Sequence, residues 1–279
     1  MKIEVRYCTN YHYESIVSFS PHVFRLFPIQ DYFVSAEKIV FTTNEDASVQ
    51  YRRDIFDNPI ACCFYPDHGQ DLHAELTMTL RLREKNAFQF LLATHALDFP
   101  FSYKPAERHV LSPYLDNAAR IELPFWKSQP KPTLDALLDL NEAIYKNIRY
   151  ERREEGAPRS SAETLALGVA ACRDFAVLLA ETLRGEGVAA RLASGYLCEF
   201  DEAEKRAEGA LHAWVEVFLP GAGWVGIDPT NGIFCNHNHI TAAVGLTPDD
   251  IAPVSGSYFN KTRVESKMTA HLELIQCDE

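Results

Sequence analysis

A thiol, an imidazole and a carboxylate occur in this 279-residue chain where they could form a nucleophilic site. Cys172 begins an apolar segment that predicts a helix, and the free N–H groups of a first helical turn favour negative charge on a sulfur atom. His212 lies in an alternating segment that predicts a strand, and Asp228 follows the next turn. In such a set the thiolate attacks a carbonyl carbon, the imidazole moves the proton, and the carboxylate orients the imidazole.

Counting across the predicted hairpin places the imidazole and the carboxylate on one face. The turn Pro220-Gly221-Ala222-Gly223 separates two segments that read as strands. Residues that face each other in an antiparallel pair have a constant index sum. A register centred on the proline pairs His212 with Asp228 and Glu216 with Trp224. The first pair is then within side-chain reach.

The helices that must position these residues follow from apolar spacing and caps. Leucines and isoleucines at helical spacing predict a helix over 133–150, with its first residue as the N-cap. The capping box Ser160-Ser161-Ala162-Glu163 predicts a short helix that ends at Gly168. A second apolar stripe predicts a helix that begins near Cys172 and stops at Gly185-Glu186-Gly187.

The first part of the chain has the pattern of strands. Alternating segments predict strands at 2–6, 34–43, 47–53 and 72–83, and a later one at 188–197. Turn residues at 57–59 and 67–70 separate the early strands, which predicts an antiparallel sandwich or half-barrel. Six prolines between 99 and 132 disfavour regular structure and predict a connector. We therefore expect an N-terminal β-rich domain at 1–125 and a catalytic domain at 126–279.

Composition and charge argue against several classes of function. The net charge of −12 disfavours nucleic acid or an anionic membrane as the main partner, because those surfaces attract basic patches. The first residues lack the apolar core of a signal peptide, and no apolar stretch reaches about 18 residues, so we expect a cytosolic location. The seven cysteines are odd in number and irregularly spaced, which predicts reduced thiols.

The segments around the candidate residues resemble the transglutaminase-like superfamily, a papain-related group that includes bacterial predicted cysteine proteases. The resemblance is carried by GVAACRDFAVLLAETLRGEGVAARLASGY (168–196), LHAWVEVFLPGAGWVGIDPTNG (211–232) and, more weakly, NHITAAVGLTPDDIAPVSGSY (238–258). The third segment ends in the family's D-x-x-P-x-x-G pattern, here Asp250, Pro253 and Gly256. YHYESIVSFSPHVFRLFP and DIFDNP resemble the β-rich region that precedes this core in a bacterial subgroup.

The resemblance implies that Cys172, His212 and Asp228 are the catalytic residues. It implies an α+β fold, in which an N-terminal antiparallel β-sandwich-like domain precedes a papain-like core with the cysteine helix packed on an antiparallel sheet. It implies a peptide or protein substrate and a reaction that needs no metal or organic cofactor. One departure is that Gly168 stands farther from the cysteine than the family pattern leads us to expect. Asp174 also belongs to the pattern, and we expect it to hydrogen bond near the helix start, away from the sulfur.

Three functions remain open from the sequence. With water as acceptor of the acyl group the protein would be a cysteine peptidase or amidase, which we favour because no segment identifies an amine site. With an amine as acceptor it would be a transglutaminase. A chain that kept the fold without turnover would be a peptide-binding module, but an intact set of three reactive residues argues against that.

Other notable residues have simpler interpretations. We interpret four of them as packing residues: Trp214, Trp224, Arg191 and Tyr196. Cys235, His237 and His239 alternate as ligands on a strand would. Three ligands on one extended segment rarely complete a tetrahedral site, so we expect a loop near the active site and no metal. The charged run 199–208 is expected to be a solvated loop, in a position to cover the cleft.

Overall fold

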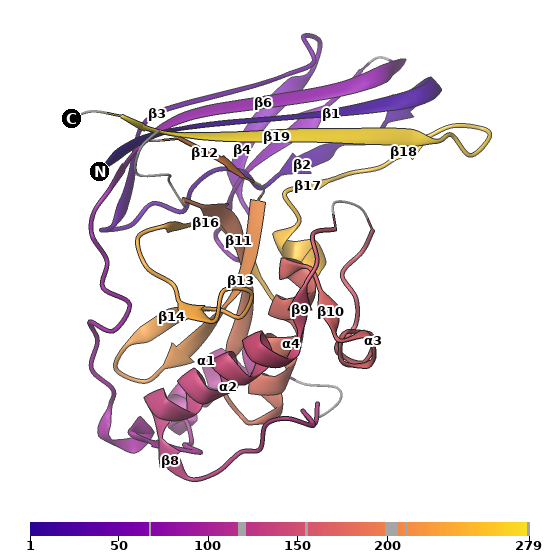
Figure 1. Cartoon of the computed structure of the whole chain (residues 1–279). Helices are drawn as coiled ribbons and strands as arrows, with labels where there is room; N and C mark the ends of the chain where they lie inside the picture. The colour runs from indigo at the N-terminus through magenta and orange to yellow at the C-terminus, as the bar shows by residue number, and fades with distance from the viewer. Residues whose placement is uncertain (67, 117–120, 154–155, 199–205, 210, 278–279) are drawn as a thin grey trace.

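Two regions build the molecule, an N-terminal pair of antiparallel sheets and a core of helices packed on a third sheet (Figure 1). The computed structural model describes residues 1–66, 68–116, 121–153, 156–198, 206–209 and 211–277. In Figure 1 the N-terminal sheets form the upper part, and the helices gather in the lower part. The predicted α+β class with a β-rich N-terminal region is confirmed.

The N-terminal sheets form the predicted sandwich. The larger sheet has the order β12 (Arg206–Gly209), β19 (Ser266–Cys277), β1 (Lys2–Phe19), β6 (His68–Leu82) and β3 (Val34–Thr43), and β18 (Tyr258–Phe259) also pairs with β1. The smaller sheet has the order β17 (Val254–Ser255), β2 (His22–Phe24), β5 (Pro59–Phe64) and β4 (Ser48–Arg53). Side chains along β1 and β6 alternate between buried and accessible, because one face packs in the core and the other meets solvent.

The strands β1 and β6 extend farther than the sequence indicated. The turn expected at 67–70 is wrong from His68 onward, because His68 and Gly69 pair with Ser18 and Val17. The register shifts within β1 after His12, so a bulge lets the ladder resume at these residues.

The larger sheet also recruits strands from the end of the chain. β19 pairs with β1 along most of its length, and β12 pairs with the outer edge of β19. The boundary predicted near residue 125 therefore does not separate the sheets, since the C-terminal strand returns to the N-terminal one. The loop expected at 199–208 is wrong for 206–208, because backbone groups there bond to the open edge of β19. Residues 199–205 lie outside the described residues.

The core sheet carries the helices. Its antiparallel order is β15 (Ile233–Phe234), β14 (Gly223–Asp228), β13 (Leu211–Leu219), β11 (Ala190–Leu197) and β16 (His239–Gly245). The helices are α1 (Pro105–Leu115), α2 (Thr133–Asn147), α3 (Ser161–Leu167) and α4 (Cys172–Gly185), with short 3-10 turns η1 (Thr94–Ala96) and η2 (Pro248–Ile251). The predicted stripe of α4 is buried against β13 and β11: Phe175, Leu178, Leu179 and Leu183. Along the described ranges, no helix combines the length and apolarity needed to cross a bilayer.

The helix ahead of the site differs from its prediction at both ends. Thr133 is the first helical residue rather than the cap, and its hydroxyl donates to a backbone carbonyl of η1 at 2.7 Å. α2 ends earlier than predicted, because the next residues form β9 (Arg149–Tyr150) beside the parallel β10 (Val169–Ala170). This ladder leads the chain directly into Cys172.

The proline-rich segment contains a helix that the sequence did not lead us to expect. Pro105 occupies the first position of α1, where its missing N–H and fixed φ suit a helix start. Pro113 deprives the carbonyl of His109 of its usual N–H partner, and the hydroxyl of Ser112 donates to that carbonyl at 3.0 Å instead. The expected connector without regular structure is therefore wrong for α1. In the described parts of the flanking pieces, the regular structure is the short ladder of β7 (Asp98–Phe99) and β8 (Lys131–Pro132).

Candidate active site

Cys172 is the first residue of α4, as predicted, and is half-buried. Asp174 secures this helix start. Its Oδ2 accepts the N–H of Ala171 at 2.9 Å, and its Oδ1 accepts the backbone N–H of Arg159 at 2.7 Å and a guanidinium N–H of Arg153 at 2.8 Å. The Asp174 side chain is fully buried and occupied by these donors, so its charge is neutralised there and not directed at the sulfur. The helix dipole remains favourable for a negative charge at the cysteine.

Gly168 ends α3 and does not form a turn next to Cys172. This explains why it stands farther from the cysteine than in the family pattern. It adopts the left-handed conformation at φ 64°, and its N–H donates to Thr164 O at 2.9 Å. At the other end Ser160 and Glu163 form the predicted capping box. β10 fills the interval between this glycine and Cys172.

The side chains of His212 and Asp228 meet across the β13–β14 hairpin. His212 Nε2 and Asp228 Oδ2 are 2.8 Å apart, with the carboxylate fully buried and the imidazole side chain 9% exposed. Trp214 is itself buried, and its ring stacks on that of His212 at a centroid distance of 6.2 Å. The predicted packing role of Trp214 therefore includes support for the imidazole.

The register of this hairpin differs from the counted one by two residues. Glu216 pairs with Gly226, which is two positions beyond the expected partner Trp224. A hairpin centred on Pro220 would have a loop of only one residue. The observed loop spans 220–222 and is closed by a backbone hydrogen bond from Ala222 N–H to Leu219 O. A shift of two residues returns every side chain to the same face. His212 therefore still meets Asp228, diagonally rather than directly opposite.

Five hydrogen-bond donors surround the carboxylate of Asp228. Its Oδ2 lies 2.8 Å from His212 Nε2, 2.8 Å from Asn231 Nδ2 and 3.2 Å from His239 Nε2. Its Oδ1 accepts the backbone N–H groups of Thr230 at 2.9 Å and Asn231 at 3.3 Å. Burial raises the pKa of Asp228, but the bonds from the two histidines outweigh burial and hold that pKa well below its usual range.

Its neighbours favour the protonated form of His212. Burial lowers the pKa of His212, but hydrogen bonds to Asp228 and to Cys172, together with their charges, raise it to about 10. Because Nε2 is engaged by the carboxylate, Nδ1 is the ring nitrogen left for the sulfur. The three residues singled out in the sequence thus lie at one place, one at a helix start and two on strands.

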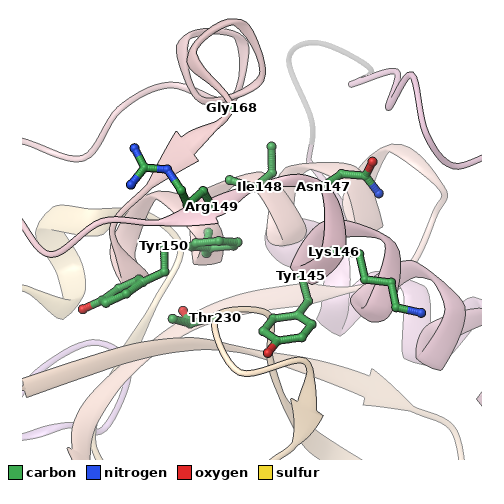
Figure 2. Close-up of a pocket in the computed structure, with 9 residues that line it drawn as sticks. Tyr145, Lys146, Asn147, Ile148, Arg149, Tyr150, Gly168 and Thr230 are labelled. Atoms are coloured by element: carbon green, nitrogen blue, oxygen red, sulfur yellow. The ribbon is translucent and has the colours of Figure 1, made fainter.

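A cavity of about 550 Å³ opens beside this cluster (Figure 2). It is bounded by the end of α2, by β9 and by the turn after β14. In Figure 2, Thr230 lies between the rings of Tyr145 and Tyr150. Tyr150 lines this cavity, and burial and then the charge of Cys172 raise the pKa of its hydroxyl. The cavity reaches the carboxylate end of the cluster through Thr230, whose backbone N–H donates to Asp228.

The alternation of Cys235, His237 and His239 does not produce a shared ligand site. Cys235 is buried against β14, whereas His239 turns to Asp228. Within the part of the chain that the structure describes, no three His, Cys, Asp or Glu side chains are grouped to hold a metal ion. The segment lies near the site, as expected, but the sequence analysis missed that His239 bonds to Asp228. No spacing rule signals its contact, because β16 and β14 are not neighbours in the sheet.

Two of the D-x-x-P-x-x-G residues join the core to the N-terminal region, and the third secures a turn within the core. Asp250 accepts two backbone N–H groups at the start of η2. The carbonyl of Pro253 accepts the N–H of Arg25 at 2.8 Å. A Cβ at Gly256 would lie 2.3 Å from the ring of His22, so only glycine allows this close approach.

Three residues interpreted as packing residues do pack. Arg191 pairs with Glu216 at 2.6 Å and lies over the ring of Trp224 at 4.2 Å. The hydroxyl of the fully buried Tyr196 donates to Leu26 O at 2.7 Å, across the boundary between the two regions.

Known proteins share both the sequence pattern and the architecture. Residues 124–229 match the transglutaminase-like superfamily, and residues 3–81 match the bacterial transglutaminase-like N-terminal region. The chain therefore contains a transglutaminase-like core, preceded by the bacterial transglutaminase-like N-terminal region. A crystal structure from Cytophaga hutchinsonii, named "Putative Cysteine Protease", aligns over 100% of this chain and 92% of its own, with a TM-score of 0.70 and 16% identity. This likeness shows a common fold.

Curated relatives of this transglutaminase-like chain occur in mycobacteria. An uncharacterized protein of Mycobacterium leprae is 38% identical over 89 residues, which are 31% of each chain. An uncharacterized protein of Mycobacterium tuberculosis is 31% identical over 139 residues, which are 47% of this chain and 44% of the relative. The chain thus matches less than half of the length of these relatives.

Proposed function

We propose that this protein transfers acyl groups through a thioester on Cys172, with water as the usual acceptor, and is therefore a cysteine peptidase or amidase. The observation that carries the proposal is the buried bond from His212 Nε2 to Asp228, which leaves Nδ1 toward a cysteine at a helix start. The match to the transglutaminase-like superfamily supports thiol chemistry in general.

In the proposed reaction the pair of Cys172 and His212 begins as thiolate and imidazolium. The thiolate attacks the carbonyl carbon of an amide, and a C–S bond forms. The imidazolium gives its Nδ1 proton to the departing amine as the C–N bond breaks, which leaves a thioester. Water then gives a proton to the imidazole, and its oxygen attacks the thioester carbon. The C–S bond breaks, the carboxylic acid leaves, and the thiolate and imidazolium are restored. Asp228 holds the imidazole in one orientation and stabilises its positive charge throughout.

The acceptor decides between hydrolysis and transfer. An amine that replaced water in the second step would make the protein a transglutaminase. The open cavity of about 550 Å³ beside the cluster is large enough for substrate side chains and also admits water. We therefore favour a peptide or protein substrate and hydrolysis. Separately, we propose that the protein is located in the cytosol.

The test is the rate at which iodoacetamide alkylates Cys172 at different pH values, measured by mass spectrometry of the cysteine-containing peptides. An activated thiolate reacts at pH 6 about tenfold faster than an ordinary thiol. Cys8, which is partly exposed on the N-terminal sheet, gives the reference rate in the same sample. We expect His212→Ala to remove the advantage of Cys172 and leave Cys8 unchanged.

A surface variant provides the matched control. His12→Ala removes an exposed histidine that also binds an aspartate, and it should alkylate as the wild type does. A wild-type Cys172 that reacts no faster than Cys8 at pH 6 would rule out the proposed enzyme. If it reacts faster, a peptide library incubated with and without added amine, against Cys172→Ala, then separates hydrolysis from transfer.

A further inference from the structure

His239 is a buried histidine that the proposed reaction does not itself use. It is the first residue of β16, and its side chain is 2% exposed. Its ring meets the ring of Trp214 edge to face at 5.4 Å, and its Nε2 lies 3.2 Å from Asp228 Oδ2. Two histidines therefore share one carboxylate oxygen.

The second ring nitrogen of His239 indicates where its proton lies. The backbone N–H of Asn236 donates to Nδ1 at 3.4 Å, so Nδ1 acts as an acceptor and carries no proton. The proton of a neutral ring is then on Nε2, which donates to Asp228. His239 is thus a neutral donor, whereas His212 carries the charge that the carboxylate stabilises.

We infer that His239 is a positioning residue, which holds Asp228 in place and through it sets how tightly His212 keeps its proton; the inference rests on the proposed function. When His239 also donates to Oδ2, the negative charge of that oxygen is divided between two donors, and each hydrogen bond is weaker than it would be alone. Asp228 therefore stays ionised but holds the imidazolium less tightly than an unshared carboxylate would. A more weakly held proton passes more readily to a leaving amine.

The titratable groups around this carboxylate and around the His212 ring come from several elements. Cys172 contacts His212 from α4, whereas Cys235, in the segment before β16, interacts with Asp228 itself. Burial and then the charge of Asp228 raise the pKa of Cys235 far above its usual value, so this thiol stays neutral and adds no charge. Among these titratable groups, the two histidines therefore decide how strongly Asp228 binds the proton of His212.

The place of His239 is fixed from both edges of β16. On one edge β16 pairs with β11, where a Cβ at Gly195 would lie 2.0 Å from the backbone of β16. On the other edge Ile29 donates its N–H to β16 at 2.7 Å, and the side chain of Asn58 exchanges two bonds of 2.8 Å with β16. The N-terminal region therefore holds the strand from which His239 reaches the site.

Two variants separate the hydrogen bond of His239 from its volume. His239→Gln keeps an N–H donor near the position of Nε2, and His239→Phe keeps a planar ring without a donor. The full-length proteins, labelled with ¹⁵N-histidine, are titrated by NMR, and Cys172 is alkylated with iodoacetamide across the same pH range. In the wild type we expect His239 to show the neutral Nε2–H tautomer at pH 8.

The loss of the donor should move the titration of His212. In His239→Phe we expect its midpoint, and the matching alkaline step in the alkylation profile, to rise by about 0.5–1 pH unit. In His239→Gln both should stay within about 0.2 unit of the wild type. An Nδ1–H tautomer of His239, equal behaviour of the two variants, or an unchanged or lowered midpoint in His239→Phe would overturn the inference.

These readouts keep the inference apart from the proposed function. Because the His212 midpoint and the His239 tautomer are seen by NMR, they are measured without any turnover. An ordinary alkylation rate at Cys172 in the wild type counts against the proposed function. A normal tautomer with no midpoint shift, in a protein whose Cys172 is activated, counts against the positioning role alone.

Discussion

Two histidine–aspartate pairs of almost equal length occupy the two regions of this molecule. In the N-terminal sheet His12 Nδ1 and Asp71 Oδ1 are 2.7 Å apart, and their side chains are 62% and 73% exposed. In the core His212 Nε2 and Asp228 Oδ2 are 2.8 Å apart, with exposures of 9% and 0%. The buried pair has strongly shifted pKa values, raised for His212 and lowered for Asp228. The two pairs thus have almost the same length but differ in their exposure to water, and the removal of water strengthens the interaction between charges.

The strands that carry the two pairs differ in the same way. β1 and β6 have one face in solvent, where water can serve polar side chains. β13 is buried on both faces along residues 212–215, so each polar group there needs a partner within the protein. The cost of leaving such a group unpaired is what fixes the geometry of the site.

The largest expected difference in stability is between variants that lack one or the other of these two aspartates. Asp228→Ala leaves a buried histidine and four further donors without their acceptor, and we expect a loss of about 3–5 kcal/mol in the free energy of unfolding. Asp71→Ala should cost about 0.5 kcal/mol or less, because water replaces the carboxylate. Urea denaturation measures both, and similar losses would contradict the comparison.

A pair of asparagines tests the same contrast with neutral groups. Asn58 exchanges two hydrogen bonds of 2.8 Å with the backbone of Val244 inside the protein, and Asn44 makes two of 2.8 Å to the backbone of β6 near the surface. We expect Asn58→Ala to cost about 3 kcal/mol and Asn44→Ala about 1 kcal/mol. Asn58→Ala should also slow the alkylation of Cys172, because β16 loses a support. Equal costs in urea denaturation would show that burial is not the deciding factor.

The smallest expected effect, taken per pH unit, is a dependence of stability on pH. The pKa of His212 is raised above its unfolded value, so its stabilisation is complete below about pH 6.5 and is lost as pH rises toward about 10. The pKa of Asp228 is lowered, so its stabilisation is present above about pH 4 and is lost in acid. Between pH 7 and 9 the unfolding free energy of the wild type should fall by up to about 1.4 kcal/mol per pH unit more than that of His212→Phe. A wild-type slope in His212→Phe would show that the His212 imidazolium is not the cause.

Local signals were sufficient for the elements that carry Cys172 and His212. Apolar spacing and glycines predicted α4 from Cys172 to Gly185, and alternation predicted β13. The shared face of His212 and Asp228 also followed, because a side chain's face depends only on whether its position is odd or even. The exact register did not follow, since the loop decided it through three residues and one hydrogen bond.

The sequence by itself thus determined which residue types could react and which elements carry them, because caps and periodicity act over a few neighbouring residues. Only the tertiary structure decided that His239 shares the carboxylate of Asp228, that the C-terminal strand joins the N-terminal sheet, and that Asn58 holds β16. Those contacts join residues that are distant along the chain or lie on strands that are not neighbours. They are selected by burial, which requires each enclosed polar group to find whichever partner the fold brings near.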